Sequence, residues 1–259
     1  TTKWIRDFCT RRQIALHEVD ASDLDAFAAL CRAEKPDLCL IETPSNPWLR
    51  ITDISGAAAA AHEVGATLVV DSTAASPVLS HPLEHGADIV MHSATKGING
   101  HSDVLAGSLA TNDAGAPRWQ MIRDDRNEAG AVIGPMEAWL LARGMRTLPL
   151  RMREMSRNAM TLAEFLADHP QVEQVMYPGL PDHPGHATAA RQMKGGFGGV
   201  LSIRLKGGRD AARAVASGCR LFAPATSLGG VESLIEHRTT SEGVDATSPE
   251  DLIRLSIGL

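Results

Sequence analysis

The 259-residue chain is predicted to be an α/β protein in which a parallel-rich sheet, flanked by helices, is followed by a smaller α/β unit. Apolar runs of strand length alternate with stretches of helical periodicity in the N-terminal part of the chain, and this alternation favours parallel strands joined by helices. Polar clusters follow the ends of the expected strands, where ligands collect in such sheets. A further strand and helix after residue 199 predict the smaller unit.

The first predicted helix begins after Ser22, which can cap it, and ends before Lys35-Pro36, because the residue before a proline avoids helical geometry. One face of this helix carries Leu24, Phe27, Ala28 and Cys31. The strand Leu38–Glu42 follows.

An alanine-rich helix is predicted to begin at Asp53, to run to Val64 and to be closed by Gly65. The apolar run Thr67–Val70 is typical of a buried strand. The next helical turn and strand are Leu83–His85 and Ile89–Met91.

Helical spacing returns beyond Gly134 in two stretches. Their apolar positions are Met136, Trp139 and Leu140, and then Met152, Met155, Ala159, Leu162 and Leu166. The second helix ends before Pro170 and could link two domains. Val200–Leu205 alternates as a half-buried strand does, and Asp210–Ser217 is predicted to be a short helix. We therefore expect a large domain over residues 1–150 and a smaller one over residues 151–259.

Composition excludes several classes of partner. A net charge of −6 with scattered arginines gives no basic field for nucleic acid, and no apolar run is long enough to span a membrane. Four cysteines without CxxC spacing, and no secretory leader, indicate reduced thiols in a soluble cytoplasmic protein. Proline and glycine separate His183 from His186, so we expect a structural loop there and no metal site.

Two polar groups that follow expected strands suit a pyridoxal phosphate (PLP) site. Lys96 lies in Ser93-Ala94-Thr95-Lys96, and Asp71 ends the preceding strand. A lysine amine forms a Schiff base with the aldehyde of PLP, while an aspartate keeps the pyridine nitrogen protonated. Ser93 and Thr95 offer hydroxyl donors to a phosphate. Lys96 alone would be an ordinary loop lysine, and Asp71 alone an ordinary capping aspartate. It is the combination of Lys96 and Asp71 that favours PLP.

Arg254 is the one charged residue in the apolar run Leu252-Ile253-Arg254-Leu255-Ser256-Ile257. A guanidinium buried there without an anion would be costly, so it requires a partner. Its forked geometry suits a carboxylate, although a surface salt bridge is the plain alternative.

Seven motifs in one order resemble those of the Cys/Met-metabolism PLP enzymes, from about residue 20 to the end of the chain. They are Glu42-Thr43-Pro44-Ser45-Asn46-Pro47, Val70-Asp71-Ser72-Thr73, His92-Ser93-Ala94-Thr95-Lys96, Gly100-His101-Ser102-Asp103-Val104, Tyr177-Pro178-Gly179-Leu180, Ser227-Leu228-Gly229-Gly230-Val231-Glu232-Ser233-Leu234 and Arg254-Leu255-Ser256-Ile257-Gly258. The resemblance implies the fold-type I architecture, a cytoplasmic homotetramer built from dimers with shared active sites, and a small sulfur amino acid as substrate.

The same resemblance implies roles for individual residues. Lys96 would carry PLP, Asp71 would pair with its ring nitrogen, and Asn46 would lie near its phenolic oxygen. Arg254 would bind the substrate α-carboxylate, and Ser227 would help to position the lysine and the substrate. Ser93 and Thr95 would bind the phosphate of PLP.

Departures from the family pattern bear on specificity and completeness. Thr226 stands where cystathionine-processing relatives often carry glutamate, which leaves room for a smaller or less polar substrate. Ala74 and Gly97 replace aromatic residues. The stacking tyrosine and the glycine-containing phosphate loop of the family are not visible, since the single tyrosine, Tyr177, belongs to another motif. We therefore expect the sequence to be part of a longer protein, or else a defective member.

The predicted function is γ-elimination or γ-replacement on sulfur amino acids, as in cystathionine γ-synthase or cystathionine γ-lyase. Methionine γ-lyase and cystathionine β-lyase are the alternatives within the family, and the motif order disfavours an aminotransferase. A non-catalytic PLP-binding scaffold is the alternative from another class. The sequence leaves open the leaving group and the choice between elimination and replacement.

Overall fold

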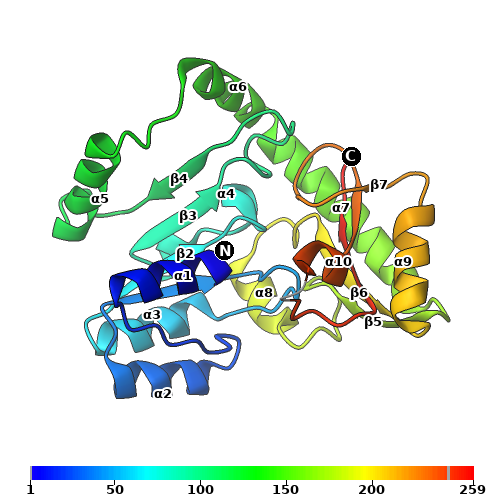
Figure 1. The fold of residues 1–259 in the computed structure, drawn as a ribbon, viewed down its shortest axis with the longest axis horizontal. Helices are drawn as coiled ribbons and strands as arrows, with labels where there is room; N and C mark the ends of the chain where they lie inside the picture. The colour runs from blue at the N-terminus through cyan, green and yellow to red at the C-terminus, as the bar shows by residue number, and fades with distance from the viewer. Residues whose placement is uncertain (1, 244–245) are drawn as a thin grey trace.

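The computed structural model describes residues 2–243 and 246–259, and it contains two sheets that the long helix α7 connects (Figure 1). The strands of the first sheet are β1 (Leu38–Glu42), β2 (Thr67–Asp71), β3 (Ile89–Ser93) and β4 (Gly107–Ala110), in that spatial order. The strands of the second sheet, in spatial order, are β5 (Val172–Met176), β6 (Val200–Leu205), β9 (Leu252–Ser256), β8 (Leu234–His237) and β7 (Ala223–Pro224).

In the first sheet β1, β2 and β3 are parallel, and β4 is antiparallel to β3. The helical segments that accompany it are α1 (Thr2–Arg12), α2 (Leu24–Glu34), α3 (Ile54–Glu63), α4 (Ser76–Leu79) and the 3₁₀ turn η1 (Pro82–His85). Phe27 of α2 and Ala57 of α3 pack with Leu68 and Val70 of β2 in one apolar core. Full burial of Leu68 or Val70 contributes about 1.5–3 kcal/mol each.

The second sheet is covered on one face by α7 (Leu148–Ala167) and α9 (Gly208–Gly218). Ala159 of α7, Ala212 of α9 and Ile253 of β9 are buried together there. Because side chains alternate along a strand, Arg254 lies on the opposite face of this sheet. Two short helices, α8 (His186–Gln192) and α10 (Arg238–Glu242), complete this part of the chain.

Helix α7 holds the two sheets together. Met152 and Met155, in its first half, pack with Ala94 and Ile98, which follow β3, whereas its second half packs on the second sheet. The long helix that the sequence pattern predicts is therefore present, and it packs against both sheets. A boundary between two domains at residue 150 remains a prediction.

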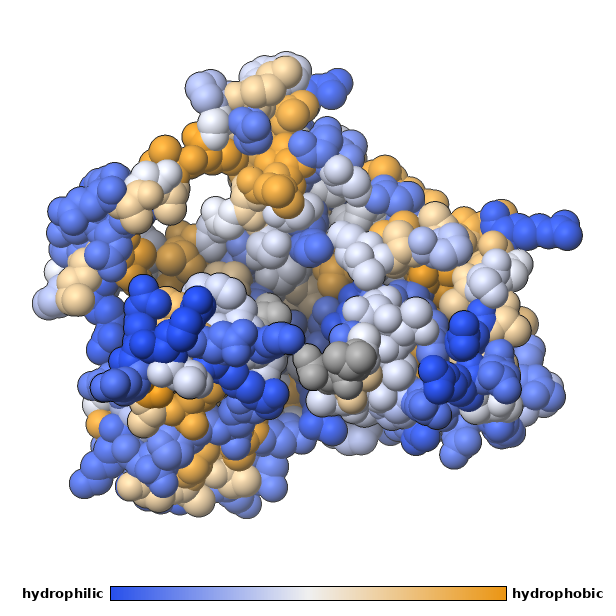
Figure 2. Space-filling model, in the orientation of Figure 1, coloured by the Kyte–Doolittle hydropathy of each residue, from blue (hydrophilic) through white to orange (hydrophobic). Residues whose placement is uncertain are grey.

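Two helices, α5 (Pro117–Glu128) and α6 (Pro135–Met145), extend away from the first sheet (Figure 1). None of the side chains of α5 is buried, and only Gly144 of α6 is. Figure 2 shows apolar surface in this region. The exposed apolar residues of the segment include Met121, Val132, Ile133, Met136 and Trp139.

The structure corrects some local expectations and confirms others. Asp23, and not Ser22, caps α2, because its side chain accepts the Ala26 N–H. Helix α3 begins one residue after the predicted Asp53, which caps it, and strand β1 has the predicted bounds. The sequence pattern does not predict strand β9, because both faces of this strand are buried and its residues do not alternate between apolar and polar. Among the described residues, none of the helices is both long and apolar enough to cross a membrane.

Candidate active site

The predicted site residues come together where the two sheets meet. Asp71 ends β2, Lys96 follows β3 and Asn46 follows β1, and the carboxyl ends of parallel strands share one edge of a sheet. Ser227 and Arg254 reach this edge from the second sheet, through hydrogen bonds to Lys96 and Asn46.

The amine of Lys96 is partly buried and held by one hydroxyl. Its Nζ donates a hydrogen bond to Ser227 Oγ at 3.0 Å. The backbone around it forms a tight turn, in which the Gly100 N–H donates to the Lys96 carbonyl at 2.8 Å. Burial lowers the pKa of Lys96, the nearby Arg254 lowers it further, and Glu236 opposes both. A larger fraction of this amine is therefore neutral, and able to act as a nucleophile, than for a lysine in water.

The carboxylate of Asp71 is fixed through one of its oxygens. Oδ1 accepts hydrogen bonds from the backbone N–H of Thr73 at 3.0 Å and from its hydroxyl at 2.6 Å. The Thr73 hydroxyl in turn accepts the Ser93 N–H at 2.8 Å, which ties the ends of β2 and β3 together. Among the described residues, none donates a hydrogen bond to Asp71 Oδ2. An oriented carboxylate with one free oxygen suits a protonated ring nitrogen.

Arg254 is almost fully buried, with 3% of its surface exposed. Its Nη1 donates to Asn46 Oδ1 at 3.1 Å, and its Nη2 donates to the Ser227 carbonyl at 2.6 Å. Its anion is Glu236, whose Oε2 lies 2.5 Å from Nη2. In the described part of the chain, Nε of Arg254 has no hydrogen-bond partner although it is buried. The sequence required an anion here, and the structure supplies Glu236, opposite Arg254 in the β8–β9 register.

Sequence reasoning did not single out Glu236 or Glu42 as site residues. Glu236 could have been noticed as the one charge in Leu234-Ile235-Glu236. Glu42 ends β1 and lies beside Asp71 in the parallel register. Solvent reaches its side chain, yet protein atoms crowd around it, so that burial raises its pKa to about 7, and the charge of Asp71 acts in the same direction. Glu42, whose pKa is raised to about 7, thus lies beside Asp71, the predicted partner of the ring nitrogen.

The two predicted phosphate ligands differ in their hydrogen bonds. Thr95 Oγ1 donates to the Ala106 carbonyl at 3.2 Å and accepts the Ala106 N–H at 2.9 Å, so its only proton is engaged. The Ser93 hydroxyl has no hydrogen-bond partner among the described residues. Ser93 is therefore the better placed donor, and the Thr95 hydroxyl would have to rotate to bind a phosphate.

Thr226 is exposed beside Ser227 and lines an open cavity of about 420 Å³, together with Glu236 and His237. The one tyrosine lies elsewhere: Tyr177 is fully buried in the core of the second sheet, and its hydroxyl donates to the Gly198 carbonyl at 2.9 Å. Tyr177 therefore has a structural role and does not belong to the site.

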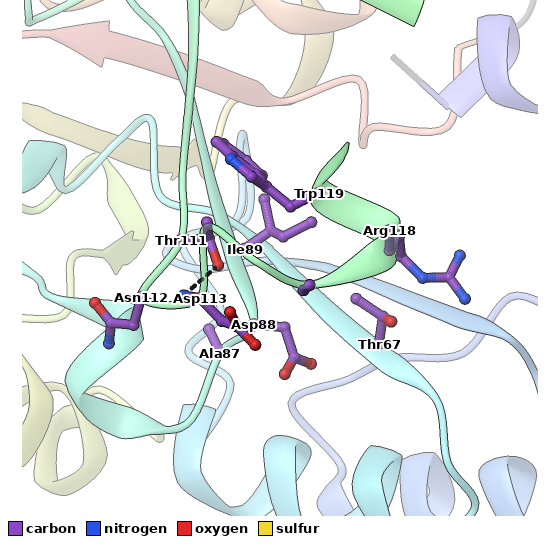
Figure 3. A pocket seen from close by; sticks show the side chains of 10 residues that line it. Thr67, Ala87, Asp88, Ile89, Thr111, Asn112, Asp113, Arg118 and Trp119 are labelled. Atoms are coloured by element: carbon purple, nitrogen blue, oxygen red, sulfur yellow. Dashed lines mark hydrogen bonds between the residues drawn. The ribbon is translucent and has the colours of Figure 1, made fainter. Parts of the chain in front are cut away.

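A smaller cavity, of about 200 Å³, lies far from these residues along the strands. Figure 3 shows it lined by Thr67 and Ile89, at the amino ends of β2 and β3, and by Arg118 and Trp119 of α5. None of the predicted site residues lines this cavity. The candidate active site is thus at the opposite ends of the same strands.

Known proteins match over the whole chain. The family model described as Cys/Met metabolism PLP-dependent enzyme matches residues 1–259. Cystathionine γ-synthase of Mycobacterium tuberculosis (strain ATCC 25618 / H37Rv) is 47% identical, over 100% of this chain and 67% of its own length. L-methionine γ-lyase of Fusobacterium nucleatum subsp. polymorphum is 42% identical, over 96% of this chain and 65% of its own length.

Solved structures agree with this match. The crystal structure of cystathionine γ-synthase from Xanthomonas oryzae pv. oryzae, in complex with aminoacrylate and cysteine, superposes with a TM-score of 0.91 at 45% identity. The match covers 99% of this chain and 68% of that chain. The chain thus spans about two thirds of the length of these relatives. The predicted fold-type I architecture is confirmed, and the chain belongs to the family of PLP-dependent enzymes of cysteine and methionine metabolism.

Proposed function

We propose that the intact protein catalyses γ-elimination or γ-replacement on a sulfur amino acid, as cystathionine γ-synthase and cystathionine γ-lyase do. The observation that carries this proposal is the arrangement of three groups. A half-buried amine with a lowered pKa, Lys96, follows β3 next to the strand end that carries the oriented carboxylate of Asp71, and it shares Ser227 as a hydrogen-bond partner with the buried guanidinium of Arg254.

The residues fit PLP. Among the described residues, Asp71 Oδ2 and the Ser93 hydroxyl have no hydrogen-bond partner, so the first suits the pyridine nitrogen and the second the phosphate. The Lys96 amine suits the aldehyde. Asn46 still has its amide donors for the phenolic oxygen, because its Oδ1 is taken by Arg254. When bound, PLP supplies a ring that accepts the negative charge left on the substrate after proton removal.

Arg254 would bind the α-carboxylate of the substrate. Its buried Nε has no hydrogen-bond partner in the part of the chain that the structure describes, and a carboxylate there would satisfy it. Asn46, Ser227 and Glu236 already fix the plane of the guanidinium. The substrate therefore meets a rigid donor, which reduces the entropy lost on binding.

Lys96 would carry protons. Its amine, when neutral, can accept the α-proton of the substrate, and burial favours that neutral form. Ser227 Oγ holds the amine at 3.0 Å and limits its direction of approach. The same amine could then deliver the proton toward the γ-carbon or the leaving sulfur.

Thr226 would face the distal end of the substrate, where it offers a neutral hydroxyl in place of a carboxylate. This residue favours methionine γ-lyase as the second candidate function, since a distal ammonium group such as that of cystathionine would find no anion at this position. The methionine γ-lyase relative supports this alternative.

We also propose that the intact protein is a cytoplasmic homotetramer. The apolar side chains on α5 and α6 support further copies of the chain as their cover: Met121, Met136 and Trp139 are 65%, 64% and 58% exposed. All four cysteines are free thiols, which suits a reducing compartment.

Asp71→Asn should preserve the fold and lower kcat on the order of 10²-fold, because an amide cannot hold the ring nitrogen protonated. Steady-state assays with PLP in excess would measure this, with the exposed Asp113→Asn as a control that keeps wild-type rates. Near-normal turnover of Asp71→Asn with PLP bound would show that another group serves the ring.

Arg254→Lys should raise KM for every α-amino acid substrate, because lysine keeps the charge but loses the forked donors. The rise should correspond to a loss of binding free energy on the order of 1.5–3 kcal/mol. Values of KM for several substrates, compared with their α-amide derivatives, would test this. An unchanged KM for the free acids would contradict the assignment of Arg254.

Thr226→Glu should change selectivity only. The new carboxylate should improve kcat/KM for cystathionine relative to methionine and homocysteine in parallel assays. Thr161→Glu is a matched control, since Thr161 lies on the exposed side of α7, away from this cavity, and should leave the three ratios unchanged. Equal effects of Thr226→Glu on all three substrates would mean that Thr226 does not face the distal end of the substrate.

A further inference from the structure

Arg151 is a buried cation that the predicted mechanism does not use. It lies in the first half of α7 and is 3% exposed. None of the ion pairs among the described residues includes Arg151. Burial lowers its pKa, but an arginine stays charged in proteins. A charged group buried without an anion requires compensation from other dipoles.

That compensation comes from neutral acceptors next to Lys96. Nη1 of Arg151 donates to the Gly97 carbonyl at 2.8 Å, and Nη2 donates to the Ile98 carbonyl at 3.1 Å. Nη2 also donates to the Gly144 carbonyl at 2.9 Å, and Nε to Thr147 Oγ1 at 3.1 Å. The guanidinium therefore ties the two residues that follow Lys96 to the junction between α6 and α7.

The backbone on both sides is shaped to receive this guanidinium. Gly100 has φ +72°, and a Cβ there would overlap the guanidinium of Arg151. A Cβ on Gly144 would overlap the Asn99 carbonyl. Two glycines thus allow Arg151 and the end of α6 to lie directly against the turn that carries Lys96.

The opposite side of the turn is held by the loop that contains Ser227. A Cβ on Gly229 would lie 2.6 Å from the Gly97 nitrogen, so the two segments are in close contact. The Val231 N–H donates to the Gly100 carbonyl at 3.1 Å. Arg151 and this loop therefore hold the turn from two sides.

We propose that Arg151 is a positioning residue for Lys96, which keeps the turn of residues 96–100 in the place where Nζ meets Ser227 and the substrate. This inference rests on the proposed function of Lys96 as the proton carrier. Loss of the guanidinium leaves buried carbonyls unpaired and frees the turn to move. A displacement of about 1 Å at a reacting group can reduce a rate on the order of 10²-fold.

The test uses the intact PLP-loaded protein and the variants Arg151→Lys and Arg151→Met. Exchange of the α-proton of L-alanine, which has no leaving group, is followed in D₂O by NMR, and kcat and KM are measured for a sulfur substrate. Arg151→Met should lower the exchange rate and kcat together, on the order of 10²-fold, with KM within about twofold of the wild type. Arg151→Lys, which keeps one charged donor, should lower the exchange rate and kcat by a smaller factor. Arg153→Met, on the exposed side of α7, should match the wild type in the exchange rate, in kcat and in KM.

Wild-type exchange and kcat in either Arg151 variant would overturn the inference, and so would a rise in KM at constant kcat. If Arg151→Met does not fold, Arg151→Lys decides: a folded lysine variant with unchanged exchange contradicts the assignment. Absence of α-proton exchange in the PLP-loaded wild type would instead contradict the proposed function itself, so the two failures are distinguishable.

Discussion

Ser227 is the residue on which the site depends, because it joins the two sheets. Its hydroxyl accepts a hydrogen bond from Lys96, in the turn that follows β3 of the first sheet, and its carbonyl accepts one from Arg254, in β9 of the second sheet. Its backbone has φ +96°, a conformation that costs a residue other than glycine about 1–3 kcal/mol. The flanking Gly229 N–H, bound to Ser256 Oγ at 3.0 Å, helps to hold the loop in this strained form.

The positive charges around Ser227 are compensated by a carboxylate, Glu236, which pairs with both Arg254 and Arg238. Arg254 lowers the pKa of the Lys96 amine, Glu236 raises it, and Glu236 also pairs with Arg254 and partly neutralises its charge. Arg238 contacts Glu236 from the other side, at 3.1 Å. A substrate carboxylate would therefore add to an existing network, and the Nε of Arg254, which has no partner among the described residues, is the donor that would meet it. Removal of Glu236 would therefore lower the pKa of the Lys96 amine further and, at the same time, remove the ion pair of Arg254.

The parts of the site that depend on local sequence could be predicted, and the parts that depend on tertiary pairing could not. Asp71 and Lys96 follow short apolar runs of strand length, so these runs and the rule that ligands collect at strand ends were sufficient to place them. The need of Arg254 for an anion also followed from its apolar neighbours. The identity of that anion, Glu236, depends on the β8–β9 register, and the role of Arg151 depends on carbonyls 53 and 54 residues away. No local pattern specifies such contacts.

The central claim is that Lys96, and no other lysine, carries PLP. Borohydride reduction of the intact PLP-loaded protein, followed by peptide mapping, tests it most directly, since the reduced bond survives digestion. The account predicts that the pyridoxyl group is found on Lys96 alone, because the pKa of this lysine is lowered and it lies at the same sheet edge as the oriented carboxylate of Asp71. A pyridoxyl group on Lys194 or Lys206, with Lys96 unmodified, would contradict it.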